Sequence, residues 1–259
     1  MNHEKPFFYQ KTGKGSVLLF LHGFLEDASI WNAYAEELSD QYTILMPDFP
    51  GHGKTPSVAD IHTMEYMAEG IRKILAKENI TQCAVIGHSM GGYVALALAE
   101  LYPQYLSGIM LMNSTSIADT DEKKANRDRV SEIVFKEKET FVRTAIPSLF
   151  AVENREKYAK EIKILTQKAL QMQTQGISAA AQGMKIRPER TAILQNFPKE
   201  KHYIIGRSDA LIPEEETVLQ AQKVGASYTI TKGGHMAYIE NYSETLSCIH
   251  SFAKRCFDI

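Results

Sequence analysis

Residues 83–92 read CAVIGHSMGG, an apolar run followed by a serine that stands between glycines. The apolar part is typical of a buried strand, and the residues from Met90 onward have the apolar spacing of a helix that Pro103 ends. A serine at such an abrupt turn adopts a strained backbone, and its flanking glycines lack the Cβ atoms that would collide with the adjoining strand and helix. We therefore expect the Ser89 hydroxyl to be presented at the carboxyl edge of a sheet. Taken alone, the pentapeptide GHSMG also fits a serine that merely caps the helix.

Short apolar runs like this one recur along the chain, and helix candidates at 29–40, 62–79 and 90–102 separate the first four of them. The runs are nearly continuous in apolar residues, which indicates strands that are buried on both faces. Strands that alternate with helices predict an α/β fold with a mostly parallel, doubly wound sheet covered on both faces. The six predicted strands are SVLLFLHG (16–23), YTILMPDF (42–49), QCAVIGHS (82–89), SGIMLMNS (107–114), KHYIIGRS (201–208) and SYTITKGG (227–234).

The alternation of strands and helices stops after residue 114. Residues 115–195 contain no convincing strand, and the part from 119 to 143 carries seven acidic and seven basic side chains, as solvated helix faces do. The same segment is too rich in apolar residues to be a linker. We therefore predict a core made of residues 1–114 and 196–259, with a helical insertion at 115–195.

The composition is that of an ordinary globular protein, with 44% hydrophobic and 23% charged residues among 259. A formal net charge of −2 gives no electrostatic footprint for nucleic acid or anionic lipid. No apolar run reaches the length of a membrane span, and residues 1–15 lack the apolar core of a signal peptide. These features predict a cytoplasmic protein with no nucleic-acid partner and no membrane span.

The three cysteines, Cys83, Cys248 and Cys256, do not have the spacing of a zinc site. Cys248 and Cys256 lie eight residues apart on a predicted helix, a rise of about 12 Å that is too long for a disulfide. Free thiols fit a reducing compartment.

GKT at 53–55 resembles the end of a phosphate-binding loop, but that loop would need glycine at position 48, which is aspartate. We therefore expect no metal and no cofactor.

Two further polar motifs follow predicted strands, as the serine motif does. GRSD at 206–209 comes after one strand, and GGHM at 233–236 comes after the next. Ser89, Asp209 and His235 thus each follow a different strand and are expected at the same edge of the sheet. HGF at 22–24 ends the first predicted strand, where a loop can supply a backbone N–H donor.

These motifs together resemble the α/β-hydrolase fold, in its small, cap-bearing esterase and haloperoxidase-like branch. The resemblance spans roughly residues 16 to 255 and implies that the helical insertion is a cap over the core. The landmarks that carry it, in order, are HGF (22–24), DFPGHGKT (48–55), GHSMGG (87–92), GMKIRPERT (183–191), GRSDALIP (206–213) and GGHMAYIEN (233–241).

The resemblance implies a role for each of the three polar residues. Ser89 would be the nucleophile, His235 the general base and then the general acid, and Asp209 the carboxylate that orients the imidazole. Some relatives carry the acid after an earlier strand, but residues 113–116 read NSTS, so Asp209 has no close rival. The backbone N–H groups of Phe24 and Met90 would form the oxyanion hole.

Other residues near these motifs are expected to be structural. His22 and His88 flank the predicted site and orient its loops, while Asp48 and His52 pack a turn. A third group, in which core filling is at least as plausible as lining an acyl pocket, consists of Met172, Met184 and Met236.

The expected activity is hydrolysis of a carboxylic ester of a small or medium apolar substrate through an acyl-enzyme. A carbon–carbon bond hydrolase or a lyase could use the same three residues, although lyase relatives usually carry arginine after the paired glycines, where this chain has Tyr93. Relatives with an aspartate nucleophile are disfavoured by serine at position 89. A ligand receptor with slow turnover stays open, and a homodimer is compatible with the sequence.

Overall fold

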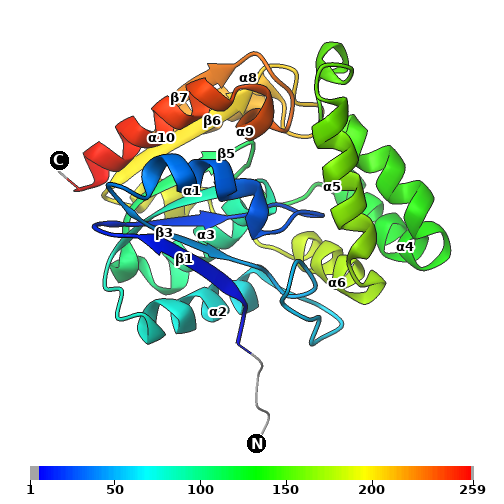
Figure 1. The fold of residues 1–259 in the computed structure, drawn as a ribbon, viewed down its shortest axis with the longest axis horizontal. Helices are drawn as coiled ribbons and strands as arrows, with labels where there is room; N and C mark the ends of the chain where they lie inside the picture. The colour runs from blue at the N-terminus through cyan, green and yellow to red at the C-terminus, as the bar shows by residue number, and fades with distance from the viewer. Residues whose placement is uncertain (1–5, 258–259) are drawn as a thin grey trace, which may run out of the picture.

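A seven-stranded sheet forms the centre of the computed structural model, which describes residues 6–257 (Figure 1). The strand order is β1-β3-β2-β4-β5-β6-β7, in which β1 pairs antiparallel with β3 and all other neighbours are parallel. The predicted α/β fold with a mostly parallel sheet is confirmed. The strands are β1 (Tyr9–Gly13), β2 (Val17–Leu21), β3 (Thr43–Pro47), β4 (Cys83–His88), β5 (Leu106–Met112), β6 (Glu200–Gly206) and β7 (Ser227–Thr231).

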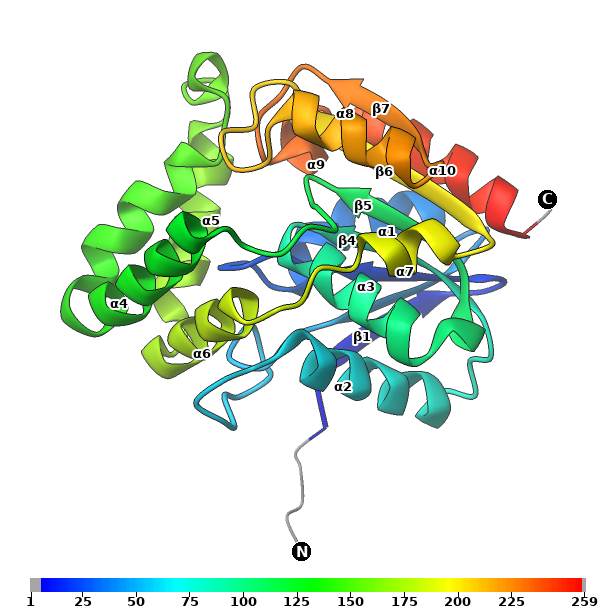
Figure 2. The ribbon, with the colours of Figure 1, turned by 180° about the vertical axis from the view of Figure 1, so that it is seen from behind.

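Helices cover both faces of this sheet, as the doubly wound pattern predicts. Along β2, Leu19 and Leu21 pack into a cluster with α2 and α3, whereas Leu18 and Phe20 pack into a cluster with α1 and α10. Helices α2, α3 and α7 lie in front in Figure 2, and α1 and α10 lie in front in Figure 1. The helices of the core are α1 (Asn32–Leu38), α2 (Met64–Lys77), α3 (Met90–Leu101), α7 (Thr191–Asn196), α8 (Glu214–Lys223), α9 (Ala237–Glu240) and α10 (Tyr242–Phe257).

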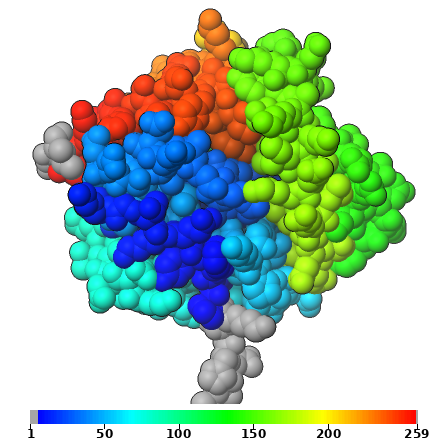
Figure 3. Space-filling model, in the orientation of Figure 1, coloured from blue at the N-terminus to red at the C-terminus, as the bar shows by residue number. Residues whose placement is uncertain are grey.

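Between β5 and α7 the chain leaves the sheet and forms a group of helices: α4 (Asp121–Ser148), α5 (Ala159–Gln171) and α6 (Thr174–Lys185). Helix α4 packs on both α5 and α6, and it is kinked at Glu137, whose backbone is not helical. These green and yellow-green helices lie beside the sheet (Figure 1), and the space-filling view shows them packed against the core (Figure 3).

The structure differs from the sequence-based expectation at three places. Strand β7 was expected to be buried on both faces, but it lies at the edge of the sheet, and of its residues only Thr231 is buried. Strand β1 was not predicted, because its residues, YQKTG, are mostly exposed and lack the apolar run that marks the buried strands. The predicted helix at 29–40 is divided into a 3-10 turn (Ala28–Trp31), which begins at the capping side chain of Asp27, and α1.

Cys83, Cys248 and Cys256 are free thiols. Among residues 6–257, no helix has the length and apolar character that crossing a bilayer requires.

Candidate active site

Ser89 occupies the junction at which β4 ends and α3 begins. Its backbone has φ 48° and ψ −115°, a strained conformation for a residue with a side chain. The glycines on either side permit this turn, because a Cβ on Gly87 would lie 2.5 Å from the Gly91 carbonyl oxygen and a Cβ on Gly91 would lie 2.3 Å from that of Leu21. The tight passage from strand to helix therefore requires glycine at both positions, and it leaves the Ser89 side chain partly accessible.

The structure brings the side chains of Ser89, His235 and Asp209 together from three separate loops. The Nε2 atom of His235 lies 2.9 Å from Ser89 Oγ, and its Nδ1 atom lies 2.8 Å from Asp209 Oδ2. Because the carboxylate accepts a hydrogen bond from Nδ1–H, the proton of the neutral imidazole stays on Nδ1, and Nε2 is left as the acceptor for the serine hydroxyl. This is the arrangement that a histidine needs in order to remove a proton from a serine.

The Asp209 carboxylate is buried and accepts four hydrogen bonds. Besides His235, the Asn113 side-chain amide donates to Oδ2 at 2.9 Å, and the N–H groups of Leu211 and Ile212 donate to Oδ1 at 2.9 and 3.0 Å. Burial alone would raise the pKa of Asp209, but the attraction of His235 and these hydrogen bonds outweigh it and hold the pKa below its ordinary value of 3.8. The carboxylate therefore stays ionised and fixed in place.

Asn113 was missed as a site residue by the sequence analysis, which used this region only to note that it lacks a carboxylate. It directly follows β5, has a positive φ of 47°, and also donates to the Gly234 carbonyl oxygen at 3.1 Å. Its amide thus ties the Asp209 loop to the loop that carries His235. The available signal was its position, since it follows a parallel strand at the same sheet edge as Ser89.

The two predicted backbone donors, Met90 and Phe24, lie next to Ser89 in the chain and in the lining of the same cavity, respectively. Met90 is the first residue of α3, so its N–H has no carbonyl partner in a preceding helical turn. Phe24 lies in the loop after β2 and lines the same cavity as Ser89. The loop is held by Glu26, whose Oε2 accepts the Gly23 N–H at 2.6 Å, and it turns through a positive φ at Leu25.

Glu26 is a second residue that the sequence analysis missed. Its buried carboxylate accepts from the Nδ1–H of His88 at 2.9 Å and from the hydroxyl of Tyr238 at 2.9 Å. The other ring nitrogen of His88, Nε2, donates to the main-chain carbonyl oxygen of His235 at 2.9 Å. The Nε2–H must donate because its partner is a carbonyl oxygen, and an ionised Glu26 carboxylate accepts from Nδ1–H, so this geometry favours an imidazolium paired with Glu26.

The pKa values of this pair move in the directions that an ion pair requires. Burial raises the pKa of Glu26, but the charge of His88 and the hydrogen bonds from His88 and Gly23 outweigh burial and lower it below 4.5. Burial lowers the pKa of His88, but the charge of Glu26 and the hydrogen bonds to Glu26 and the His235 carbonyl raise it above 6.5. The pair therefore keeps its charges although both side chains are buried.

A cavity of about 260 Å³ opens over Ser89, between the loops of the core and helix α4. Its lining is largely apolar, with a few polar and charged groups, as in small-molecule sites. Of the three methionines considered in the sequence, Met184 lines this cavity, whereas Met172 and Met236 are buried in the core. The apolar side chains that line it are Phe24, Leu25, Val130, Phe141, Ala145, Leu149, Met184, Leu211 and Ile212.

Two other polar residues that were expected to be structural, His22 and Asp48, accept hydrogen bonds from backbone N–H groups. His22 Nε2 accepts the Phe49 N–H at 3.0 Å, and Asp48 accepts the N–H groups of Ala28 and Lys54, both at 2.8 Å. His52 is fully buried, and burial lowers its pKa to about 3, so the ring is neutral.

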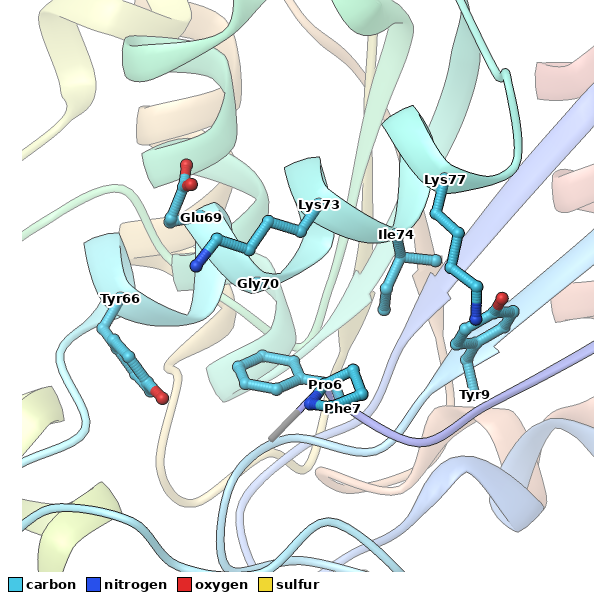
Figure 4. Close-up of a pocket in the computed structure, with 9 residues that line it drawn as sticks. All are labelled: Pro6, Phe7, Tyr9, Tyr66, Glu69, Gly70, Lys73, Ile74 and Lys77. Carbon is cyan, nitrogen blue, oxygen red and sulfur yellow. The ribbon is translucent and has the colours of Figure 1, made fainter. Parts of the chain in front are cut away.

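A second, smaller cavity of about 170 Å³ lies between α2 and the first described residues of the chain, and Ser89 does not line it (Figure 4). Its walls include Phe7, Tyr66 and Ile74. Among its described lining residues there is no histidine, serine or cysteine that could act as a nucleophile or base. Among residues 6–257, no group of three or more histidine, cysteine or acidic side chains could hold a metal ion.

With this geometry in place, comparison with known proteins assigns the family. Residues 16–242 match the profile of the alpha/beta hydrolase fold, and the chain belongs to that family. Among solved structures, a thermophilic esterase from Thermogutta terrifontis is similar with a TM-score of 0.92 and 30% identity, over 96% of this chain and 93% of that one.

Two curated relatives extend the comparison at lower identity. One is the dihydrolipoyllysine-residue acetyltransferase component of an acetoin cleaving system from Cupriavidus necator, 26% identical over 92% of this chain and 63% of that protein's length. The chain therefore spans less than two thirds of that relative. The other is 2-succinyl-6-hydroxy-2,4-cyclohexadiene-1-carboxylate synthase from Enterobacter sp. (strain 638), 25% identical over 90% of this chain and 89% of that protein.

Proposed function

We propose that this protein is a serine hydrolase that cleaves a carboxylic ester of a small or medium apolar substrate through an acyl-enzyme. The single observation that carries the proposal is Ser89, on its strained backbone, with its Oγ 2.9 Å from His235 Nε2, while His235 Nδ1 is 2.8 Å from a buried carboxylate. An unactivated hydroxyl is a poor nucleophile, and this arrangement gives it a base within reach.

In the proposed reaction, Ser89 Oγ attacks the ester carbonyl carbon while its proton passes to His235 Nε2. The negative oxygen that forms accepts hydrogen bonds from the N–H groups of Phe24 and Met90. As the intermediate collapses, His235 returns the proton to the departing alcohol, and Ser89 is left acylated. Water then attacks the acyl carbon while its proton passes to the same imidazole, and His235 returns that proton to Ser89 Oγ as the bond to the acyl group breaks and the acid leaves. Asp209 keeps the imidazole oriented throughout.

The cavity around Ser89 supports two parts of the proposal, namely that the acyl group of the substrate is apolar and that a cap covers the site. The cavity walls are mostly aliphatic and aromatic, and several of them come from α4. We accordingly assign residues 115–195 the role of a cap that selects the substrate, over a core formed by 1–114 and 196–259. A cytoplasmic location belongs to the same proposal and is supported by the three free cysteines.

Other reactions could use the same three side chains, and one curated relative is named as a synthase. The lyase alternative needs a guanidinium near Tyr93. Arg187 stacks 3.9 Å from the Tyr93 ring centre, but it is engaged with Asp119 and with the carbonyl oxygens of Met184 and Ile117. That engagement favours ester hydrolysis over a lyase reaction that would grip a substrate through Arg187.

The test is turnover of p-nitrophenyl acetate and butyrate, measured on the unaltered protein and on Ser89→Ala. Sustained turnover that the variant lacks, with fluorophosphonate labelling of Ser89, supports the proposal. A single burst with no steady state identifies a slow-turnover receptor instead. Treatment with EDTA is expected to leave the activity unchanged, and a screen of longer p-nitrophenyl esters would define the preferred acyl length.

A further inference from the structure

The cavity over Ser89 has a charged wall as well as its apolar one. Three polar residues of the cavity lining, Lys123, Asn126 and Arg127, lie in the first two turns of α4. Their spacing of three and four residues puts them on one face of the helix, and Val130 continues that face as the first apolar lining residue. Toward the cavity, helix α4 therefore presents Lys123 and Arg127 near its start and apolar side chains such as Val130 and Phe141 farther along. The acidic residues of its first turn, Asp121 and Glu122, do not line the cavity.

The charges around the cavity do not cancel. Glu26 is balanced by His88, as described above. Asp119 is buried, with its Oδ1 2.8 Å from Arg187 Nη1 and its Oδ2 3.0 Å from Arg127 Nε. One carboxylate thus meets two guanidinium groups, so one positive charge is in excess.

Lys123 adds a second positive charge to this wall. Its Nζ lies 3.5 Å from the carbonyl oxygen of Leu211, in the loop that carries Asp209. A carbonyl oxygen offers a weak contact and no counter-charge, and the Lys123 side chain is exposed. Asp119, Arg187, Arg127 and Lys123 together therefore carry two positive charges with no matching carboxylate, although Arg187 itself does not line the cavity.

We infer that the substrate of this site is an ester that carries an anionic group, a carboxylate or a phosphate, which Arg127 and Lys123 bind at the start of α4. This inference rests on the proposed function and specifies its substrate class. The Arg127 guanidinium uses Nε for Asp119, which orients its remaining N–H groups as donors for the anion. The apolar wall of the cavity then contacts the part of the substrate that lies between its anionic group and its ester group.

The inference is tested by binding, which needs no turnover. Affinities are measured by calorimetry on Ser89→Ala for the monomethyl esters of succinate, glutarate and adipate and for neutral methyl esters of matched length. The same measurements are made after adding Lys123→Gln and Arg127→Gln, and separately after adding Lys124→Gln and Arg129→Gln. The control pair removes two positive charges from the same helix at positions that do not line the cavity.

We expect at least one monoester anion to bind about tenfold tighter than its neutral counterpart or more, as hydrogen bonds to charged groups allow. Lys123→Gln with Arg127→Gln should abolish most of this preference, and the control pair should keep it. In the Ser89→Ala protein without other changes, high salt should also reduce the preference, because both cations are partly exposed. Methyl esters with a terminal phosphonate distinguish a phosphate-bearing substrate from a carboxylate-bearing one.

Equal binding of anionic and neutral esters would overturn the inference, as would an equal loss of preference in both pairs of variants. Should the Lys123→Gln, Arg127→Gln protein fail to fold, the salt dependence and the single variant Lys123→Gln decide the question. These outcomes are separate from the proposed function. A protein that turns over neutral p-nitrophenyl esters through Ser89 but ignores the anion retains the proposed function and lacks only the anion site.

Discussion

Glu26 and His88 form a buried ion pair, Oε2 to Nδ1 at 2.9 Å, that connects two loops of the candidate active site. Glu26 holds the Gly23 N–H in the loop that precedes Phe24, and His88 holds the main-chain carbonyl of His235. The loop of the proposed oxyanion donor Phe24 and the loop of the proposed base His235 are thereby both bonded to this pair. Neither side chain is itself placed to react with a substrate.

The first prediction concerns the stability that this pair contributes as a function of pH. A lowered Glu26 pKa stabilises the fold fully above 4.5, and this contribution is lost as the pH falls through the folded pKa. A raised His88 pKa stabilises it fully below 6.5, and this contribution is lost as the pH rises through the folded pKa. Glu26→Gln should therefore cost most between pH 4.5 and 6.5, by about 3–5 kcal/mol of unfolding free energy.

Urea unfolding across this pH range measures the difference, with the exposed Glu36→Gln as the control. A cost that grows steadily toward high pH would show that His88 is neutral in the folded protein.

Replacing the serine should separate catalysis from folding. Ser89→Ala is expected to reduce kcat/KM for p-nitrophenyl butyrate by about 10⁴-fold or more, because no hydroxyl remains to be acylated. The melting temperature should stay close to that of the unaltered protein, since the lost hydroxyl is partly accessible and lies in no packed core. Ser208→Ala, at an exposed position before Asp209, is the control, and a loss below tenfold in Ser89→Ala would refute the assignment of the nucleophile.

Asp209→Asn tests whether the carboxylate controls the tautomer of the imidazole. The four donors around Asp209 suit an ionised carboxylate, and an amide would turn an NH₂ group toward two of them, because each oxygen accepts two hydrogen bonds. We expect kcat to fall by about 10⁴-fold while KM changes little, because the substrate does not contact this side chain. Steady-state kinetics beside the exposed Asp121→Asn provide the comparison, and a parallel rise in KM would point to a disordered loop instead.

Gly91→Ala tests the steric argument for the turn. The added methyl group would lie 2.3 Å from the Leu21 carbonyl oxygen, so either β2 or the start of α3 must shift. A cost of about 1–3 kcal/mol in unfolding free energy is expected from overpacking of this kind. Because the shift moves the Met90 N–H, turnover should fall even in protein that remains folded. Unchanged stability and turnover would mean that the close approach of α3 to β2 is dispensable.

The single HGF motif places the Phe24 side chain in the cavity beside Ser89. We therefore expect tert-butyl esters to be hydrolysed far more slowly than n-butyl esters of the same acid, because a tertiary alcohol needs more room near the acyl carbon. Side-by-side rates with the two esters give the measurement. Comparable rates would show that Phe24 leaves the alcohol side of the cavity open.

Much of the architecture could be predicted from the sequence because its signals are local. Continuous apolar runs marked the buried strands β2 to β6, and a shorter run marked β7, whose residues are mostly exposed or half-buried. The glycines around Ser89 marked the turn between β4 and α3. Strand β1 was not predicted, because it is an edge strand whose exposed side chains form no apolar run. The positions of Ser89, Asp209 and His235 after parallel strands predicted that these residues would lie at one edge of the sheet.

The sequence by itself determined the order of strands and helices, the strained serine turn and the residue types that face it, because each depends on neighbours a few positions away. Only the tertiary structure decided that Asn113 holds Asp209, that Glu26 and His88 are charged, and that Arg127 and Lys123 face the cavity. Those facts depend on contacts between segments that are distant along the chain. Burial and the nearest partner set a charge or a hydrogen bond, and neither is encoded in local spacing.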